Sequence, residues 1–165
     1  GEEPYTLAIQ VHRTLGVRLS DWRIEILGTD ISQKVLVDAQ KGVYGDYALH
    51  ATDALVKSRY FKPHADGYEI DPTVKSMVVF EKLNLKDVFA AKRHGTWDVI
   101  FCRNVMIYFD QKMRDGCLEM FGQQLAADGT LFIGHSEAIR DSKVFQPRPE
   151  AYAFAYTKIN AGESR

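Results

Sequence analysis

Three predicted strands of this chain end in polar residues that could bind a ligand. Thr29 and Asp30 follow the apolar run IEILG, Asn84 follows FEKL, and Arg103 and Asn104 follow VIFC. A carboxylate at such a position can accept two hydrogen bonds from the vicinal hydroxyls of a ribose, as in nucleotide-binding α/β folds. Asp30 therefore has two interpretations: it binds a ribose, or it caps the following helix, since Asp is common before helices.

These polar residues have to be positioned by strands and helices. The sequence predicts a first helix with Pro4 in its first turn and its end at Gly16. The core-facing stripe of this helix is expected to comprise Leu7, Ala8, Val11 and Leu15. The strand before Asp30 is followed by a predicted helix, with Ser32 as its N-cap and Gly42 as its end.

The middle of the chain changes from a helical period to a strand-like one. Residues 46–61 are expected to be helical in one or two pieces. Residues 67–85 contain apolar runs on both sides of Asp71–Pro72, which predicts a small antiparallel hairpin. The continuous apolar run Val99–Cys102 is typical of a central parallel strand that is covered on both faces.

The last third of the chain predicts a further strand, helix, strand unit. Asp110 can cap a helix, and the sequence ADGT turns this helix into the strand LFIG. The apolar face of the helix is expected to comprise Met113, Cys117, Met120, Phe121 and Leu125. A final strand is indicated by the alternating residues Tyr152, Phe154 and Tyr156. Residues 160–165 are expected to be frayed.

Strands that alternate with helices predict an α/β fold with a doubly wound parallel sheet, in which ligands bind beyond the carboxyl ends of the strands. With 165 residues and 45% hydrophobic content, the chain is expected to form one domain. The 21 basic and 22 acidic residues indicate neither nucleic acid nor an anionic membrane as a partner. No stretch has the length of a membrane span or the pattern of a signal segment, so we expect a soluble protein.

The cysteines and histidines indicate no metal or disulfide chemistry. Cys102 and Cys117 stand in apolar surroundings without Cys-x-x-Cys spacing, which predicts buried, reduced thiols in a cytoplasmic protein. The histidines lack ligand spacing, and we expect no metal site. His135 and Ser136 are interpreted as loop residues, because adjacency in the sequence does not make a nucleophile and its base.

Five segments in this order resemble the CheR-type chemotaxis methyltransferases, which transfer a methyl group from S-adenosylmethionine to protein glutamates. The segments are GEEPYTLAI, GTDIS, FEKLNL, DVIFCRNVMIYFD and LFIGHSEAI, and the resemblance covers essentially the whole chain. It implies a Rossmann-like, doubly wound methyltransferase sheet with a small inserted antiparallel β-subdomain at about residues 60–83. It also implies a bacterial, cytoplasmic protein that binds transiently at receptor arrays.

The resemblance implies a set of residues that bind S-adenosylmethionine and its product S-adenosylhomocysteine in one cleft. Glu2 would contact the methionine end of the cofactor, with Glu3 as the weaker candidate, and Asp30 would hold the ribose. The other implied cofactor residues are Asn84 and Leu85 beside the adenine, and Asn104 and Val105 near the sulfonium. Each has a plainer alternative: first-turn acids for Glu2 and Glu3, a strand terminator for Asn84, and a core residue for Val105.

The resemblance also implies that Arg103 and Tyr108 act on the substrate. A glutamate carboxylate, with an ordinary pKa of about 4.3, is ionised at neutral pH and needs no general base. The main demand is therefore orientation. Arg103 can bind the substrate carboxylate with its planar guanidinium, and Tyr108 can donate its hydroxyl to the other oxygen. The alternatives are a salt bridge for Arg103 and a half-buried packing ring for Tyr108.

Two other enzyme classes fit the sequence less well than a CheR-type methyltransferase. A nicotinamide dehydrogenase would need a glycine-rich first turn, which this chain does not show. A nucleic-acid methyltransferase would have a proline-containing motif where this chain has NVMIYF, and the net charge of -1 gives no phosphate footprint. A cofactor-binding interaction or regulatory domain without its own turnover stays as the alternative.

The expected partner is the cytoplasmic domain of a chemoreceptor. Relatives that are tethered to a receptor's C-terminal pentapeptide carry an extra glycine-containing loop in the small subdomain, and they add the peptide as a strand. Residues 62–68, KPHADGY, have a single glycine and no identifiable extra loop residues. We therefore expect recognition that does not depend on the pentapeptide.

In the resembled family, the segment GEEPY directly follows the first strand of the sheet, so we expect residues 1–165 to be a fragment that lacks this strand. An open slot would leave unpaired backbone groups, each costing roughly 1 to 3 kcal/mol. A folded form is expected to fill the slot with a co-purified piece, a strand swapped from a second copy, or a shift of neighbouring strands.

Overall fold

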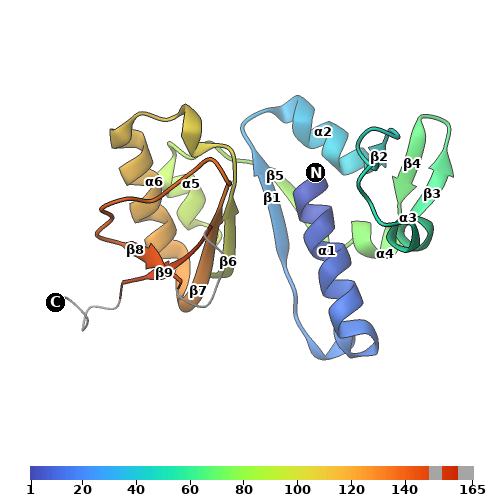
Figure 1. Cartoon of the computed structure of the whole chain (residues 1–165), viewed down its shortest axis with the longest axis horizontal. Coiled ribbons are helices and arrows are strands. Elements are labelled where there is room, and N and C mark those ends of the chain that lie inside the picture. Colours follow the sequence, from blue (N-terminus) through green and yellow to red (C-terminus); the bar gives the residue numbers. More distant parts are fainter. Residues whose placement is uncertain (149–153, 160–165) are drawn as a thin grey trace. The chain divides into compact units, whose positions relative to one another are not determined.

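The structure is a computed structural model that describes residues 1–148 and 154–159. The chain divides into two compact units, Gly1–Leu83 and Asn84–Arg165 (Figure 1). The β-subdomain at about residues 60–83 stays a prediction, because compactness separates only these two units. Within the described ranges, none of the helices combines the length and the apolar character that crossing a membrane requires.

The first unit begins with helix α1, Glu2–Leu15, which ends at Gly16 as predicted. A short 3-10 helix, Gly16–Asp21, follows it. The predicted stripe of α1 is wrong except for Ala8, because the buried residues are Tyr5, Ala8 and Ile9. The aromatic ring of Tyr5 sets this face: it packs edge-on against Phe80 at 5.5 Å, and its hydroxyl donates a hydrogen bond to the Ala39 carbonyl at 3.2 Å. Leu7, Val11 and Leu15 are only partly buried.

Strand β1, Ile26–Asp30, pairs in parallel with β5, Val78–Lys82, and Asp30 lies opposite Lys82 at the carboxyl ends of both strands. Helix α2, Gln33–Lys41, connects β1 to the next part of the unit. Both predicted ends of α2 are confirmed. The Val35 N–H donates to the Ser32 hydroxyl at 3.4 Å, and Gly42 adopts the left-handed conformation with φ 65°.

A three-stranded antiparallel sheet with the order β2-β4-β3 follows α2 (Figure 1). Its strands are β2 (Val43–Tyr44), β3 (Phe61–His64) and β4 (Gly67–Ile70). Helix α3, Ala54–Tyr60, leads into β3, so only the second part of the predicted helical segment is an α-helix.

The antiparallel hairpin predicted around Asp71–Pro72 is wrong. The hairpin is formed by β3 and β4, whose pair His64 and Gly67 closes it with two intervening residues. Asp71 instead caps helix α4, Pro72–Lys75, and accepts a hydrogen bond from the Thr73 N–H at 2.9 Å. An Asp-Pro pair suits the N-cap and first position of a helix as well as a turn, which explains the error.

The second unit contains a sheet with the order β6-β7-β9-β8, in which β6 and β7 are parallel and the other pairs are antiparallel. The strands are β6 (Trp97–Cys102), β7 (Leu125–Ile133), β8 (Phe145–Pro147) and β9 (Ala155–Lys158). The helices are α5 (Val88–Lys92), the 3-10 helix η2 (Met106–Tyr108) and α6 (Gln111–Gln124).

Helix α6 confirms its predicted cap and apolar face. Asp110 accepts a hydrogen bond from the Met113 N–H at 2.8 Å. Of the five predicted face residues, Met113 is half-buried, and the other four, Cys117, Met120, Phe121 and Leu125, are buried, although Leu125 is the first residue of β7. Cys102 and Cys117 are buried, as expected, and neither thiol takes part in a disulfide. The predicted turn ADGT belongs to β7 instead, where the pairing with β6 shifts register between Trp97 and Val99.

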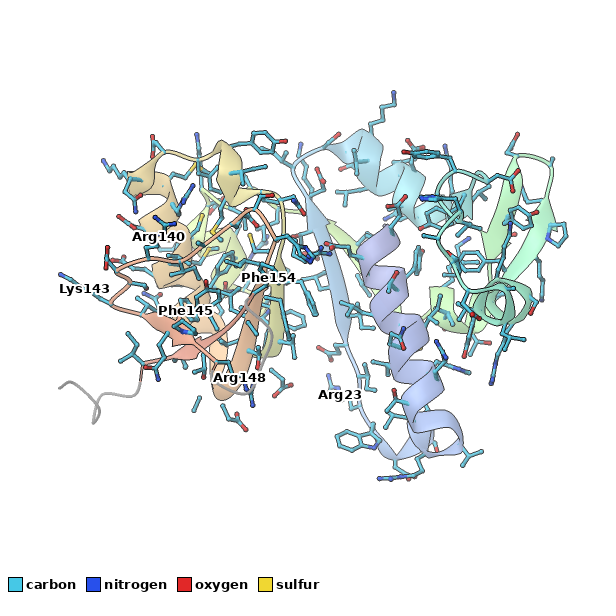
Figure 2. The ribbon with its side chains drawn as sticks, viewed as in Figure 1. Arg23, Arg140, Lys143, Phe145, Arg148 and Phe154 are labelled. Atoms are coloured by element: carbon cyan, nitrogen blue, oxygen red, sulfur yellow. The ribbon has the colours of Figure 1, made fainter. Side chains whose placement is uncertain are left out.

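The C-terminal strands complete this unit. β9 confirms the predicted last strand for Tyr156, whereas Tyr152 and residues 160–165 lie outside the described residues. Arg148, labelled in Figure 2 together with the buried Phe145, donates a hydrogen bond to the hydroxyl of Thr130 on β7. This contact links the end of β8 to β7, and it anchors the chain just before the undescribed segment.

Strand β6 differs from its predicted central, fully covered position. It is the end strand in the order β6-β7-β9-β8, and the side chains of Val99 and Phe101 are 45% and 39% exposed. Phe101 stacks on Phe132 of β7 with ring centroids 4.7 Å apart, so one face of the strand pair is still packed.

Replacing Gly42 by Ala should destabilise the first unit. The Cβ atom would lie 2.8 Å from Cγ2 of the buried Ile70, in a conformation that L-residues rarely adopt. We expect the free energy of unfolding in urea to fall by about 1 to 3 kcal/mol. Gly45→Ala is the matched control, because its added Cβ meets no described atom within 4 Å. Equal stability of the two variants would contradict this interpretation.

Candidate functional site

A pocket of about 450 Å³ lies in the first unit, at the carboxyl end of β1. Glu2 reaches it from the first turn of α1, Asp30 from the end of β1, and Tyr44 from β2. The structure therefore brings together Glu2, its weaker alternative Glu3, and Asp30, although 28 positions separate Glu2 from Asp30 in the sequence. Their carboxylates make the pocket suitable for a ligand with cationic or hydroxyl groups.

Asp30 is half-buried, and one of its carboxylate oxygens has a structural partner. Oδ1 accepts a hydrogen bond from the Ser32 N–H at 2.7 Å, which stabilises the turn after β1. The N-cap of α2 is Ser32, so Asp30 does not cap this helix directly. Among the described residues, none donates a hydrogen bond to Oδ2 of Asp30. The turn and a ligand can therefore use different oxygens of the same carboxylate.

In the second unit, the predicted residues Arg103, Asn104, Val105 and Tyr108 lie on the segment that follows β6. Arg103 is half-buried, and Asn104 is exposed with a positive φ of 58°. Val105 is 38% exposed, which argues against a core position, and Tyr108 is 82% exposed, which argues against a packing ring. These side chains are therefore accessible from solvent at the carboxyl end of a strand.

Asn84 and Leu85 lie at the start of the second unit, before α5. Asn84 stabilises a turn: its Oδ1 accepts from the Lys86 N–H at 3.0 Å, and its carbonyl accepts from the Asp87 N–H at 2.8 Å. This geometry favours the plainer interpretation of Asn84 as a residue that ends the strand segment, but it leaves the side-chain NH₂ group for a ligand. Leu85 is half-buried beside Cys117, whose thiol donates to the Leu85 carbonyl at 3.9 Å.

A buried carboxylate that sequence reasoning missed holds the segment after β6. Glu137 is 8% exposed, and its Oε2 accepts from the Gly134 N–H at 2.7 Å and the Asn104 N–H at 2.9 Å. Its Oε1 accepts from the Ile107 N–H at 3.2 Å. Hydrogen bonds to a charged acceptor are stronger than neutral ones. Glu137 therefore fixes the backbone on both sides of Val105.

The surroundings of Glu137 leave little space. A Cβ atom at Gly134 would lie 2.8 Å from Oε2 of Glu137 and 2.9 Å from the Asn104 nitrogen. His135, predicted to be a loop residue, packs its exposed ring on Phe154 with centroids 4.3 Å apart (Figure 2 labels Phe154). The signal in the sequence was a single acidic residue four positions after the end of a buried strand, in LFIGHSEAI. Its partners, 30 and 33 positions away, are not visible in the sequence.

The pocket places acidic side chains beyond the end of a parallel strand, which is where open α/β sheets bind nucleotide-type ligands. Residues 1–154 match the family model of the CheR methyltransferase, SAM binding domain. The chain therefore belongs to the CheR methyltransferase family, whose donor is S-adenosylmethionine.

Curated relatives agree with this assignment. A chemotaxis protein methyltransferase of Borreliella burgdorferi is 40% identical over 87% of this chain and 50% of its own length. Chemotaxis protein methyltransferase 2 of Vibrio cholerae is 33% identical over 99% of this chain and 57% of its own length. A probable biofilm formation methyltransferase of Pseudomonas aeruginosa is 33% identical over 84% of this chain and 32% of its own length. The chain thus spans about half the length of the first two relatives.

Replacing Glu137 by Gln should destabilise the second unit, because an NH₂ group would then face backbone N–H donors. We expect the free energy of unfolding to fall by about 2 to 4 kcal/mol, measured by urea denaturation with a probe in the second unit. Glu119→Gln, on the exposed side of α6, is the matched control and should change stability by less than about 0.5 kcal/mol. An unchanged stability of Glu137→Gln would show that these hydrogen bonds contribute little.

Proposed function

We propose that the protein transfers a methyl group from S-adenosylmethionine to glutamate side chains of a chemoreceptor's cytoplasmic domain, giving methyl esters. The observation that carries this proposal is the family match over residues 1–154. Two of the relatives above are named chemotaxis protein methyltransferases. The proposal includes a bacterial cytoplasmic location, with transient binding at receptor arrays.

The pocket of the first unit suits the proposed donor. S-adenosylmethionine, when bound, supplies a methyl group that is activated by a sulfonium. Asp30 would accept hydrogen bonds from the ribose hydroxyls with the oxygen that the Ser32 turn does not use. Glu2 would bind the ammonium of the amino-acid end from the first turn of α1. Both carboxylates also favour the positive charge of the ligand over an uncharged nucleoside.

The residues after β6 would act on the remaining parts of the reaction. Arg103 would bind and orient the substrate carboxylate, and the exposed hydroxyl of Tyr108 would donate to its other oxygen. The further cofactor contacts that we propose are Asn84, Leu85, Asn104 and Val105. The backbone of Asn104 is held by Glu137, which supports a fixed geometry at this position.

The antiparallel sheet supports recognition that does not depend on a receptor pentapeptide. The β3–β4 hairpin has only two residues between its last pair, His64 and Gly67. No inserted loop is present between these described residues to make room for an added peptide strand.

Arg103→Ala and Asp30→Ala should separate substrate placement from cofactor binding. We expect Arg103→Ala to lower methyl transfer to receptor fragments roughly a hundredfold, with cofactor affinity within a fewfold of the wild type. Asp30→Ala should instead weaken cofactor binding by about 1.5 to 3 kcal/mol through lost charge-assisted hydrogen bonds. Calorimetric titration with S-adenosylhomocysteine and a radiolabelled methyl-transfer assay measure the two effects.

Two exposed residues provide matched controls for these variants. Asp21→Ala and Arg140→Ala, the latter labelled in Figure 2, should leave both measurements close to the wild type. Loss of cofactor binding in Arg103→Ala would contradict its proposed role. Unchanged affinity in Asp30→Ala would restrict Asp30 to the turn after β1.

The receptor pentapeptide should bind weakly if at all. We expect a dissociation constant above about 1 mM for a peptide of this type, measured by fluorescence polarisation, because the short hairpin offers no additional loop. A peptide of the same composition and scrambled order is the control. Sequence-dependent binding in the micromolar range would overturn this part of the proposal.

A further inference from the structure

Tyr44 carries a buried polar atom that the proposed function does not use. Within residues 1–148 and 154–159, the hydroxyl of Tyr44 is a buried side-chain group without a hydrogen-bond partner. Its ring is held by edge-on contacts with Tyr5 and Phe61, with centroids 6.3 Å and 6.1 Å away. An unsatisfied buried hydroxyl costs roughly 1 to 3 kcal/mol, so a ligand that accepts a hydrogen bond from this group would gain affinity.

Tyr44 and Glu2 line the same two cavities of the first unit. One is the candidate cofactor pocket, and the other is a second cavity of about 360 Å³. Burial, followed by the proximity of Tyr5 and Glu2, raises the pKa of the Tyr44 hydroxyl above its ordinary value. The hydroxyl therefore stays protonated at neutral pH and is available as a hydrogen-bond donor.

We propose that the Tyr44 hydroxyl donates a hydrogen bond to the α-carboxylate of the bound cofactor's amino-acid end, next to the ammonium that Glu2 binds. This inference rests on the proposed function, because it takes S-adenosylmethionine or its product as the ligand. Each charged group of the amino-acid end then has a partner in the protein. The Glu2 carboxylate accepts from the ligand's ammonium, and the Tyr44 hydroxyl donates to the ligand's carboxylate. A second carboxylate in place of Tyr44 would repel the anionic part of the ligand.

The test compares two ligands that differ only at the end in question. S-adenosylhomocysteine contains the amino-acid end, whereas 5′-methylthioadenosine retains the nucleoside and lacks that end. Titration calorimetry of Tyr44→Phe should show an affinity for S-adenosylhomocysteine that is roughly 5 to 20 times lower than that of the wild type. The affinity for methylthioadenosine should stay within about twofold.

The stability of the ligand-free protein gives a second, independent measurement. Because the hydroxyl has no described partner, Tyr44→Phe should leave the melting temperature unchanged or raise it. Tyr47→Phe is the matched control, since Tyr47 follows Tyr44 by three residues and is 88% exposed. Asp30→Ala is a second control. In contrast to Tyr44→Phe, it should weaken the binding of both ligands, because both contain the ribose.

Each remaining result has a defined meaning. Unchanged S-adenosylhomocysteine affinity in Tyr44→Phe, or an equal loss for both ligands, overturns the assignment of the hydroxyl to the amino-acid end. A clear fall in the melting temperature of ligand-free Tyr44→Phe overturns it too, because the hydroxyl would then have a partner within the protein. If the wild-type protein binds neither ligand, the proposed function fails and this inference fails with it.

Discussion

Backbone N–H groups at the carboxyl ends of parallel strands need acceptors, and this requirement organises both units. After β1, the Ser32 N–H donates to Asp30, and in the turn that follows β5 the Lys86 N–H donates to Asn84. Both are local bonds across two residues. After β6 the acceptor is remote, because Glu137 receives the N–H groups of Asn104 and Ile107. Side-chain oxygens at these ends are therefore structural as well as available to a ligand.

Whether such a contact is local or remote in the sequence explains which parts of the fold could be predicted. Ser32, Gly42 and Asp110 act within a few residues of their own positions, so their effects were visible in the local pattern. The buried face of α1 was not, because it depends on Tyr5 packing against Phe80, 75 positions away. The predicted stripe did not include Tyr5, although this residue is 3% exposed and its aromatic ring dominates the buried face.

The candidate site also contains residues that could be predicted from the sequence and residues that could not. The place of Asp30 in the candidate pocket could be predicted, because ligands of α/β folds bind at the carboxyl ends of the strands. Glu137 and Tyr44 were missed for different reasons. The structural role of Glu137 depends on hydrogen bonds to distant backbone groups. Tyr44 is singled out only because its hydroxyl has no described hydrogen-bond partner. Neither property has a sequence pattern, because both depend on three-dimensional burial, which decides whether a polar atom must be satisfied.

The proposed reaction joins a cationic donor to an anionic acceptor, and the two kinds of charge are recognised by different residues. Glu2 and Asp30 supply carboxylates to one pocket of the first unit, which suits an ammonium and a sulfonium. Arg103 supplies a guanidinium on the segment after β6, which suits a substrate carboxylate. With a net charge of -1, the chain has no strong overall field that would favour one reactant over the other. Discrimination between S-adenosylmethionine and the substrate glutamate therefore has to come from these local groups. The uncharged Tyr44 hydroxyl can bind the carboxylate of S-adenosylmethionine through a hydrogen bond, without a positive charge that would also attract the substrate carboxylate.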